Sequence, residues 1–194
     1  MMNTKARVRV QKIETLSNDW YLLQKTTFDY LRSNGEWQTQ RRETYDRGNG
    51  ATILLYHPMQ RTVILTRQFR YPVFVNGYAE LLIEAPAGLL DESSQEARIK
   101  VETEEETGYC VQQVRKVFEA YMSPGSVTEK LYFFVAEYDP ASRAGSGGGL
   151  RDEGEDIEVL ELPFDQAFAM IEQGAIVDAK TIMLLQYAQL HLFH

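Results

Sequence analysis

Residues 88–109 read GLLDESSQEARIKVETEEETGY, and this stretch determines how the rest of the chain is interpreted. A loop containing Gly88 leads into a run of helical character. Ser93 or Ser94 can cap the start of such a helix, and Gly108 stands where a C-terminal cap glycine belongs. The stretch therefore predicts a loop, then a helix that begins after the serines and ends at the glycine.

Three glutamates near the end of the predicted helix carry its chemistry. Glu102, Glu105 and Glu106 are spaced i, i+3 and i+4, so their carboxylates share one face. Like charges at this spacing repel, and the C-terminal end of a helix disfavours anions. A solvated acidic face is the alternative interpretation, and it is the one that suits Glu104. For the other three, the pattern predicts a site for a hard cation such as Mg²⁺, with Mn²⁺ possible.

The residues of this stretch resemble the Nudix box, whose general form is G-x5-E-x7-R-E-U-x-E-E-x-G-U, with U apolar. Gly88, Glu102, Glu105, Glu106 and Gly108 match it. The resemblance implies that these three glutamates hold the metal.

The box departs from the general form in four ways. The span between its glycines is one residue short, and Ser94 stands where the first glutamate is expected. Val101 replaces the arginine that normally orients the carboxylates, and Thr103 replaces an apolar residue. These departures affect the residues that support the carboxylates more than the metal site itself.

The resemblance extends from roughly Tyr45 to Gln186. The segments TYDRGNGATILLY, RQFRYPVFVNG, YMSPGSVTE and GGGLRDEGEDIEVLELPF are similar to the branch of GDP-mannose and ADP-ribose pyrophosphatases. The resemblance implies an α+β protein, built as a Nudix-type α/β/α sandwich with an N-terminal antiparallel β-meander.

Patterning supports a division into two parts. Alternating or β-rich runs at residues 5–14 and 19–30, and a third ending at Tyr45, predict about three antiparallel strands. Short apolar strands interspersed with helical patterns follow. We therefore expect residues 1–48 to form an N-terminal sheet and residues 49–194 to form the hydrolase domain. The glycine-rich residues 140–154 are expected to form a mobile loop.

Composition excludes several classes of protein. The 194 residues carry a net charge of −8, which argues against a nucleic-acid binder. There is no run of about eighteen apolar residues and no signal-peptide pattern at the start, so no membrane span is expected. Cys110 is the single cysteine, which favours a reducing cytoplasm.

The remaining site residues follow from the resemblance. The carbonyl of Ala87 is implied as a further metal ligand, and Glu153 or Glu155 of the acidic loop as the catalytic base. A base on a closing loop can complete the site as water is expelled. A hydrophilic loop with incidental acids is the alternative.

Substrate contacts are expected at the end of one strand and beside the box loop. Arg70 in RQFR resembles the arginine of the family that contacts phosphate, whereas Arg67 is either a second contact or a solvated strand residue. Glu84 matches an acid that lines the site in the branch, and a surface position is the alternative. The family also implies a homodimer formed through the N-terminal strands, which contribute to substrate binding.

Three functions are consistent with these residues. The first is Mg²⁺-dependent hydrolysis of a nucleoside diphosphate sugar, with GDP-mannose giving GMP and mannose 1-phosphate, or ADP-ribose giving AMP and ribose 5-phosphate. The second is a Nudix-like binding regulator without catalysis, which Val101 and Ser94 favour and the retained glutamates oppose. The third, a dimerisation module, leaves the acidic face unexplained.

Overall fold

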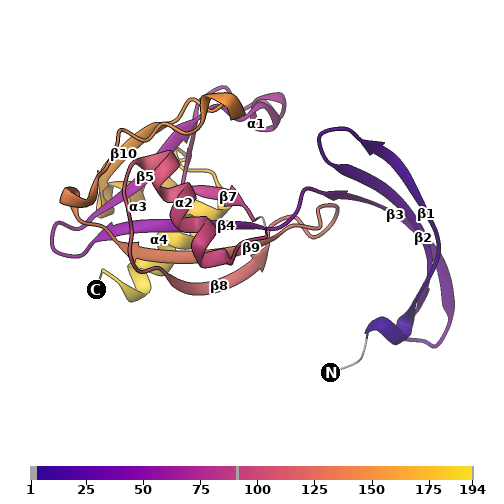
Figure 1. Cartoon of the computed structure of the whole chain (residues 1–194). Helices are drawn as coiled ribbons and strands as arrows, with labels where there is room; N and C mark the ends of the chain where they lie inside the picture. Colours follow the sequence, from indigo (N-terminus) through magenta and orange to yellow (C-terminus); the bar gives the residue numbers. More distant parts are fainter. Residues whose placement is uncertain (1–3, 91, 194) are drawn as a thin grey trace. The chain divides into compact units, whose positions relative to one another are not determined.

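The computed structural model describes residues 4–90 and 92–193 and divides them into two compact units (Figure 1). The first unit contains the residues up to Asn49 together with Tyr121–Lys130. The second contains Gly50–Ala120 and the residues from Leu131 onward. Within the described residues, no helix has the length and apolar character that a membrane crossing requires.

The first unit is the expected three-stranded meander. A short 3₁₀ helix, η1 (Thr4–Arg7), precedes antiparallel strands in the order β1-β2-β3: β1 (Val8–Asn18), β2 (Leu22–Leu31) and β3 (Trp37–Asp46). A register shift between Val10 and Lys12 puts Val10 and Ile13 on one face of β1, where they are 59% and 56% exposed. A sheet of this size needs a surface on which to bury its apolar face.

The segment between β8 (Arg115–Tyr121) and β9 (Lys130–Glu137) completes this unit. The backbone N–H of Tyr45 donates to Ser126 O at 2.8 Å, and the N–H of Thr128 donates to Tyr45 O at 3.1 Å. A parallel bridge joins Tyr45 to Val127. These contacts tie a loop from the middle of the chain to the end of β3.

The second unit is built on a mixed sheet in the order β10-β5-β4-β9-β8. Strand β4 lies parallel to β9 and antiparallel to β5, and two short strands, β6 and β7, pair with β5 and β4. The strands are β4 (Gly50–His57), β5 (Thr62–Gln68), β6 (Leu82–Glu84), β7 (Ala87–Leu89), β8 (Arg115–Tyr121), β9 (Lys130–Glu137) and β10 (Glu158–Pro163).

Helices cover both faces of this sheet, which makes the expected α/β/α sandwich (Figure 1). Helix α2 (Gln95–Thr107) packs Ile99 against Ile53 and Leu55 of β4. On the opposite face lie α3 (Phe164–Glu172) and α4 (Ala179–His191), whose side chains include the buried Leu184. A short α1 (Tyr71–Val75), which the sequence patterns do not predict, follows β5.

The ends of α2 confirm the predicted caps. Ser94 Oγ accepts from the N–H of Ala97 at 3.2 Å, and Gly108 adopts a left-handed φ of +77° while donating to Glu104 O. Between the two candidate serines, the structure therefore selects Ser94.

The glycine-rich loop is anchored to the end of α2, which differs from the expected mobile loop. The N–H groups of Gly148 and Gly149 donate to Glu106 O and Glu105 O, both at 3.0 Å, and that of Ala144 donates to Gly108 O at 2.8 Å. Two 3₁₀ turns, η2 (Pro140–Ser142) and η3 (Arg151–Glu153), lie near the two ends of this loop. Backbone donors of the loop thus satisfy carbonyls that the last turn of a helix leaves free.

Substitution of Gly147 tests this anchor. Its φ is +67°, and a Cβ atom there would lie 2.5 Å from Glu106 O and 2.6 Å from Thr107 C. We expect Gly147→Ala to lower the free energy of unfolding by about 2–4 kcal/mol, through backbone strain and overpacking. Urea titration measures the change. Gly145→Ala is the matched control because the nearest atom would lie 4.0 Å away, and equal stabilities of the two variants would contradict the anchor.

Candidate active site

The acidic face of α2 is buried where it carries chemistry. Glu102 and Glu106 are 7% and 2% exposed, and Glu105 is half-buried. Glu104 is exposed, as expected for the glutamate assigned to solvent. The structure therefore brings two carboxylates of the box into the interior, with the third at its edge.

Burial changes the acidity of these carboxyls. Desolvation raises the pKa of Glu106 to about 8, and the charges of Glu102 and Glu155 add to the rise. Desolvation likewise raises the pKa of Glu102 to about 7, opposed by Arg98 and reinforced by Glu105 and Glu155. Two buried acids that destabilise each other's charged form are the arrangement that a bound cation relieves.

The loop at β7 fits closely around these acids. A Cβ atom on Gly88 would lie 2.0 Å from Glu102 Cδ, so only glycine leaves room for that carboxylate. The N–H of Ala87 donates to Glu106 Oε2 at 3.3 Å. Within residues 4–90 and 92–193, no three carboxylate, imidazole or thiol groups converge into a complete metal site. The donor set nevertheless suits Mg²⁺, which typically takes one or two carboxylates together with substrate phosphate.

A pH titration of stability tests the burial of the two acids. On folding, the pKa of Glu102 rises from 4.5 to about 7 and that of Glu106 from 4.5 to about 8. Between pH 4.5 and about 8, the folded chain therefore binds more protons than the unfolded chain does. In chelator, the free energy of unfolding should therefore be highest near pH 5 and fall as the pH rises to about 8. Urea titrations across this range measure it. The double variant Glu102→Gln/Glu106→Gln should lose this slope, and an equal slope in both proteins would contradict the burial.

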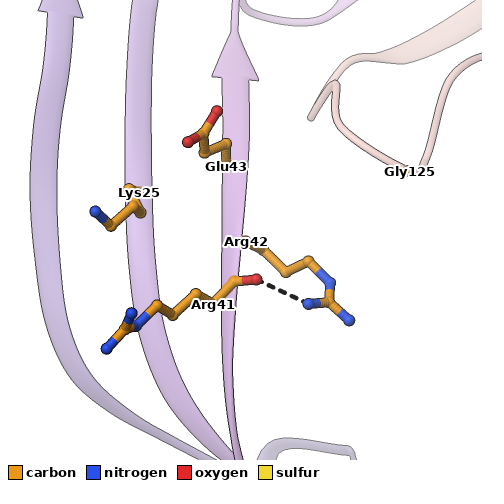
Figure 2. Close-up of a pocket in the computed structure, with 5 residues that line it drawn as sticks. All are labelled: Lys25, Arg41, Arg42, Glu43 and Gly125. Atoms are coloured by element: carbon orange, nitrogen blue, oxygen red, sulfur yellow. Dashed lines mark hydrogen bonds between the residues drawn. The ribbon is translucent and has the colours of Figure 1, made fainter.

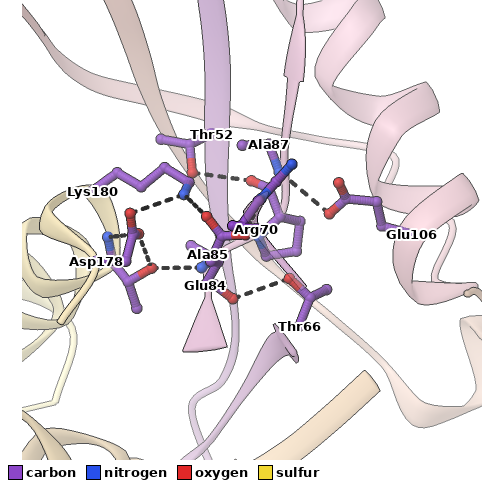
Figure 3. Close-up of polar contacts among 11 residues, drawn as sticks. Thr52, Thr66, Arg70, Glu84, Ala85, Ala87, Glu106, Asp178 and Lys180 are labelled. Carbon is purple, nitrogen blue, oxygen red and sulfur yellow. Dashed lines mark hydrogen bonds and ion pairs between the residues drawn. The ribbon is translucent and has the colours of Figure 1, made fainter. Parts of the chain in front are cut away.

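A second group of charges lies at the end of β6 (Figure 3). Glu84 is 4% exposed. Its Oε2 accepts a hydrogen bond from Arg70 Nε at 2.8 Å, and its Oε1 accepts one from Lys180 Nζ at 2.6 Å. Lys180 also pairs with Asp178 at 3.1 Å. Burial would raise the pKa of Glu84, but Lys180 and Arg70 together hold it below its usual range. Glu84 is thus a buried ion-pair partner, and the alternative of a surface acid is wrong.

Arg70 joins this group to the acidic face of α2. Its side chain is 40% exposed, and Glu106 and Glu155 are among the charges that raise its pKa. Arg67 has a different partner: its Nε donates to Glu158 Oε2 at 2.8 Å across the β5–β10 pair, and the two side chains are 41% and 51% exposed. The structure thus places Arg70 near the acids, whereas Arg67 pairs with Glu158.

The two candidate bases differ in what the structure describes. Glu155 Oε2 accepts from the N–H of Leu150 at 2.8 Å, and its charge contributes to the raised pKa values of Glu102 and Glu106. Glu155 therefore lies near the acidic face. Glu153 ends η3, and its side chain is outside the described part of the chain.

Two cations of the site are absent from the sequence-based prediction. Lys180 lies in the first turn of α4, and its partner Glu84 is 96 residues away in the chain. Arg98 forms an ion pair with Glu102 one helical turn along α2. The i, i+4 spacing was a usable signal for Arg98, whereas no local pattern links Lys180 to Glu84.

The chain is similar to known GDP-mannose pyrophosphatases. Residues 7–45 match the model of the GDP-mannose pyrophosphatase NudK N-terminal domain. A GDP-mannose pyrophosphatase of Pectobacterium atrosepticum is 60% identical over 174 residues, which is 89% of each chain. One of Yersinia pestis is 56% identical over 189 residues, covering 96% of this chain and 94% of the relative.

A solved structure supports the fold. The crystal structure of an ADP compounds hydrolase matches with a TM-score of 0.70 at 18% identity, over 94% of this chain and 92% of that one. The chain belongs to the GDP-mannose pyrophosphatase family of Nudix hydrolases.

Proposed function

We propose that this protein is a Mg²⁺-dependent pyrophosphohydrolase that cleaves GDP-mannose to GMP and mannose 1-phosphate. The buried acidic face of α2 beside the Gly88 loop carries the proposal. The substrate is supported by the relatives, whose names give them as GDP-mannose pyrophosphatases. Water attacks one phosphorus of the P–O–P bridge, and the bridging oxygen leaves with the other phosphate.

The metal site is formed by the residues of the box. Nudix hydrolases generally need a divalent metal. Glu102, Glu105 and Glu106, with the carbonyl of Ala87, would hold Mg²⁺, with Mn²⁺ as a substitute. When bound, the metal supplies positive charge to the pyrophosphate oxygens.

The other residues of the site act on protons and on charge. Glu155 accepts the proton of the attacking water, a role that its place near Glu102 and Glu106 supports, and Glu153 is the alternative base. Arg70 and Lys180 offer cationic donors to the charge that develops on the phosphates, while Glu84 holds both in place. Arg67, which pairs with Glu158, is the candidate for a second substrate contact.

The N-terminal unit is proposed to serve dimerisation and substrate binding. The exposed Val10 and Ile13 offer an apolar face for a second copy of the chain. This unit also contains a hollow of about 320 Å³ lined by Lys25, Arg41, Arg42, Glu43 and Gly125 (Figure 2). Its three cations suit a polyanionic substrate. We further propose a cytoplasmic location, supported by Cys110 as the single cysteine.

Product analysis tests the proposal. The purified protein is incubated with GDP-mannose or ADP-ribose, each with Mg²⁺ or with chelator, and the products are separated by ion-exchange chromatography. GMP and mannose 1-phosphate, formed only with Mg²⁺, are the expected result. Formation of AMP and ribose 5-phosphate alone would mean that the mechanism holds but that the substrate is ADP-ribose. A folded protein that turns over neither would favour a binding regulator.

A further inference from the structure

The box lacks the arginine that normally precedes its first core glutamate, and the structure offers another cation for that carboxylate. Val101, the residue at that position, is 44% exposed and has no charge. Arg98 lies one helical turn before Glu102 and forms an ion pair with it. The two side chains are 24% and 10% exposed, so solvent screens this pair less than a surface pair.

A second contact fixes the guanidinium of Arg98. Its Nε donates to the carbonyl oxygen of Leu89 at 3.3 Å, while Nη2 faces Glu102 Oε1. Leu89 ends β7, the strand that also contains Gly88, over which the Glu102 carboxylate packs. One planar side chain therefore links α2 to the loop that borders the acids.

We propose that Arg98 is a positioning residue that holds the Glu102 carboxylate in place for the metal and so replaces the missing arginine of the box. The inference rests on the proposed function, because Glu102 must be a metal ligand for its position to matter. Arg98 is assigned no contact with substrate.

The neighbouring lysine does not share this role. Lys100 lies on the same helix, but its Nζ donates to Gln112 O at 2.7 Å. Removing Lys100 therefore deletes one positive charge from α2 without touching Glu102. It is the matched control for Arg98.

Mn²⁺ binding, measured by isothermal titration calorimetry on the full chain without substrate, tests the proposal. We expect Arg98→Ala to weaken Mn²⁺ about tenfold, since loss of a residue that orients a metal ligand typically has this effect. Arg98→Lys keeps the positive charge but loses the planar guanidinium. Its Mn²⁺ affinity should therefore lie between those of Arg98→Ala and the wild type. Lys100→Ala should bind Mn²⁺ as the wild type does.

A double-variant cycle separates positioning from a general structural effect. In the Glu102→Gln background, Arg98→Ala should cause no further loss of Mn²⁺ affinity, because the ligand that it orients is gone. Equal losses in both backgrounds would overturn the proposal. So would wild-type or tighter Mn²⁺ binding by folded Arg98→Ala, which would mean that the guanidinium competes with the metal.

The same titrations distinguish failure of this inference from failure of the proposed function. If the wild type does not bind Mn²⁺, or Glu102→Gln binds it equally well, the metal site itself is wrong and both proposals fall. If Glu102→Gln weakens binding and Arg98→Ala does not, only the role of Arg98 is wrong. Circular dichroism establishes that each variant is folded. If Arg98→Ala unfolds, the Mn²⁺ affinity of Arg98→Lys tests the role of Arg98 in its place.

Discussion

Glu106→Gln should lower kcat for GDP-mannose by about a thousandfold or more. The substitution keeps the size of the side chain and an oxygen that can accept from Ala87 N–H, but it removes the charge that would hold the metal. Metal-derived stabilisation of a transition state is worth several kcal/mol, and about 4 kcal/mol corresponds to a thousandfold. Steady-state kinetics at saturating Mg²⁺ measure the change.

Two comparisons make this result specific. Glu104→Gln removes one charge from the exposed side of the same helix and should leave kcat unchanged. In chelator at pH 8, Glu106→Gln should unfold at a higher temperature than the wild type, because it no longer buries a carboxyl whose pKa is raised to about 8. A Glu106→Gln protein with near wild-type kcat would rule out the metal assignment.

Gly88→Ala should lower kcat about a hundredfold while the protein remains folded. The new methyl group would lie 2.0 Å from both Cδ and Oε1 of Glu102, so the flexible carboxylate has to move away from the loop. A displacement of about 1 Å in a catalytic arrangement can cost about a hundredfold in rate.

Kinetics and Mn²⁺ titration together check the Gly88 prediction. Both kcat and Mn²⁺ affinity should fall, whereas Gly145→Ala, where a Cβ meets no close atom, should change neither. Unchanged Mn²⁺ affinity in Gly88→Ala would mean that the position of the Glu102 carboxylate relative to this loop is irrelevant to the metal.

Local signals predicted much of the fold. Ser94 and Gly108 cap α2 as their residue types require, and the alternation of Val8 and Val10 with polar residues marks the meander. Cap hydrogen bonds and strand alternation depend on residues that are close together in the chain, so a local sequence pattern can predict them.

Long-range contacts account for what the sequence could not supply. Lys180 is held by an ion pair with Glu84, which is 96 residues away in the chain. The glycine-rich loop is held by hydrogen bonds to the backbone carbonyls of Glu105 and Glu106. The glycine-rich composition indicated mobility because glycine has no side chain to pack. The loop is nevertheless anchored, because its backbone N–H groups donate hydrogen bonds. The partners of the two arginines in RQFR also lie far along the chain: Arg67 pairs with Glu158 of β10, and Arg70 pairs with Glu84 of β6.

The most direct measurement is hydrolysis of GDP-mannose by the wild type, Glu106→Gln and Glu155→Gln in water enriched in oxygen-18, with Mg²⁺ and with chelator. We expect Mg²⁺-dependent products with the label in one phosphate only, and rates reduced by orders of magnitude in both variants. Hydrolysis that persists in chelator, or that both variants catalyse at the wild-type rate, would contradict a metal-dependent pyrophosphatase centred on the acidic face of α2.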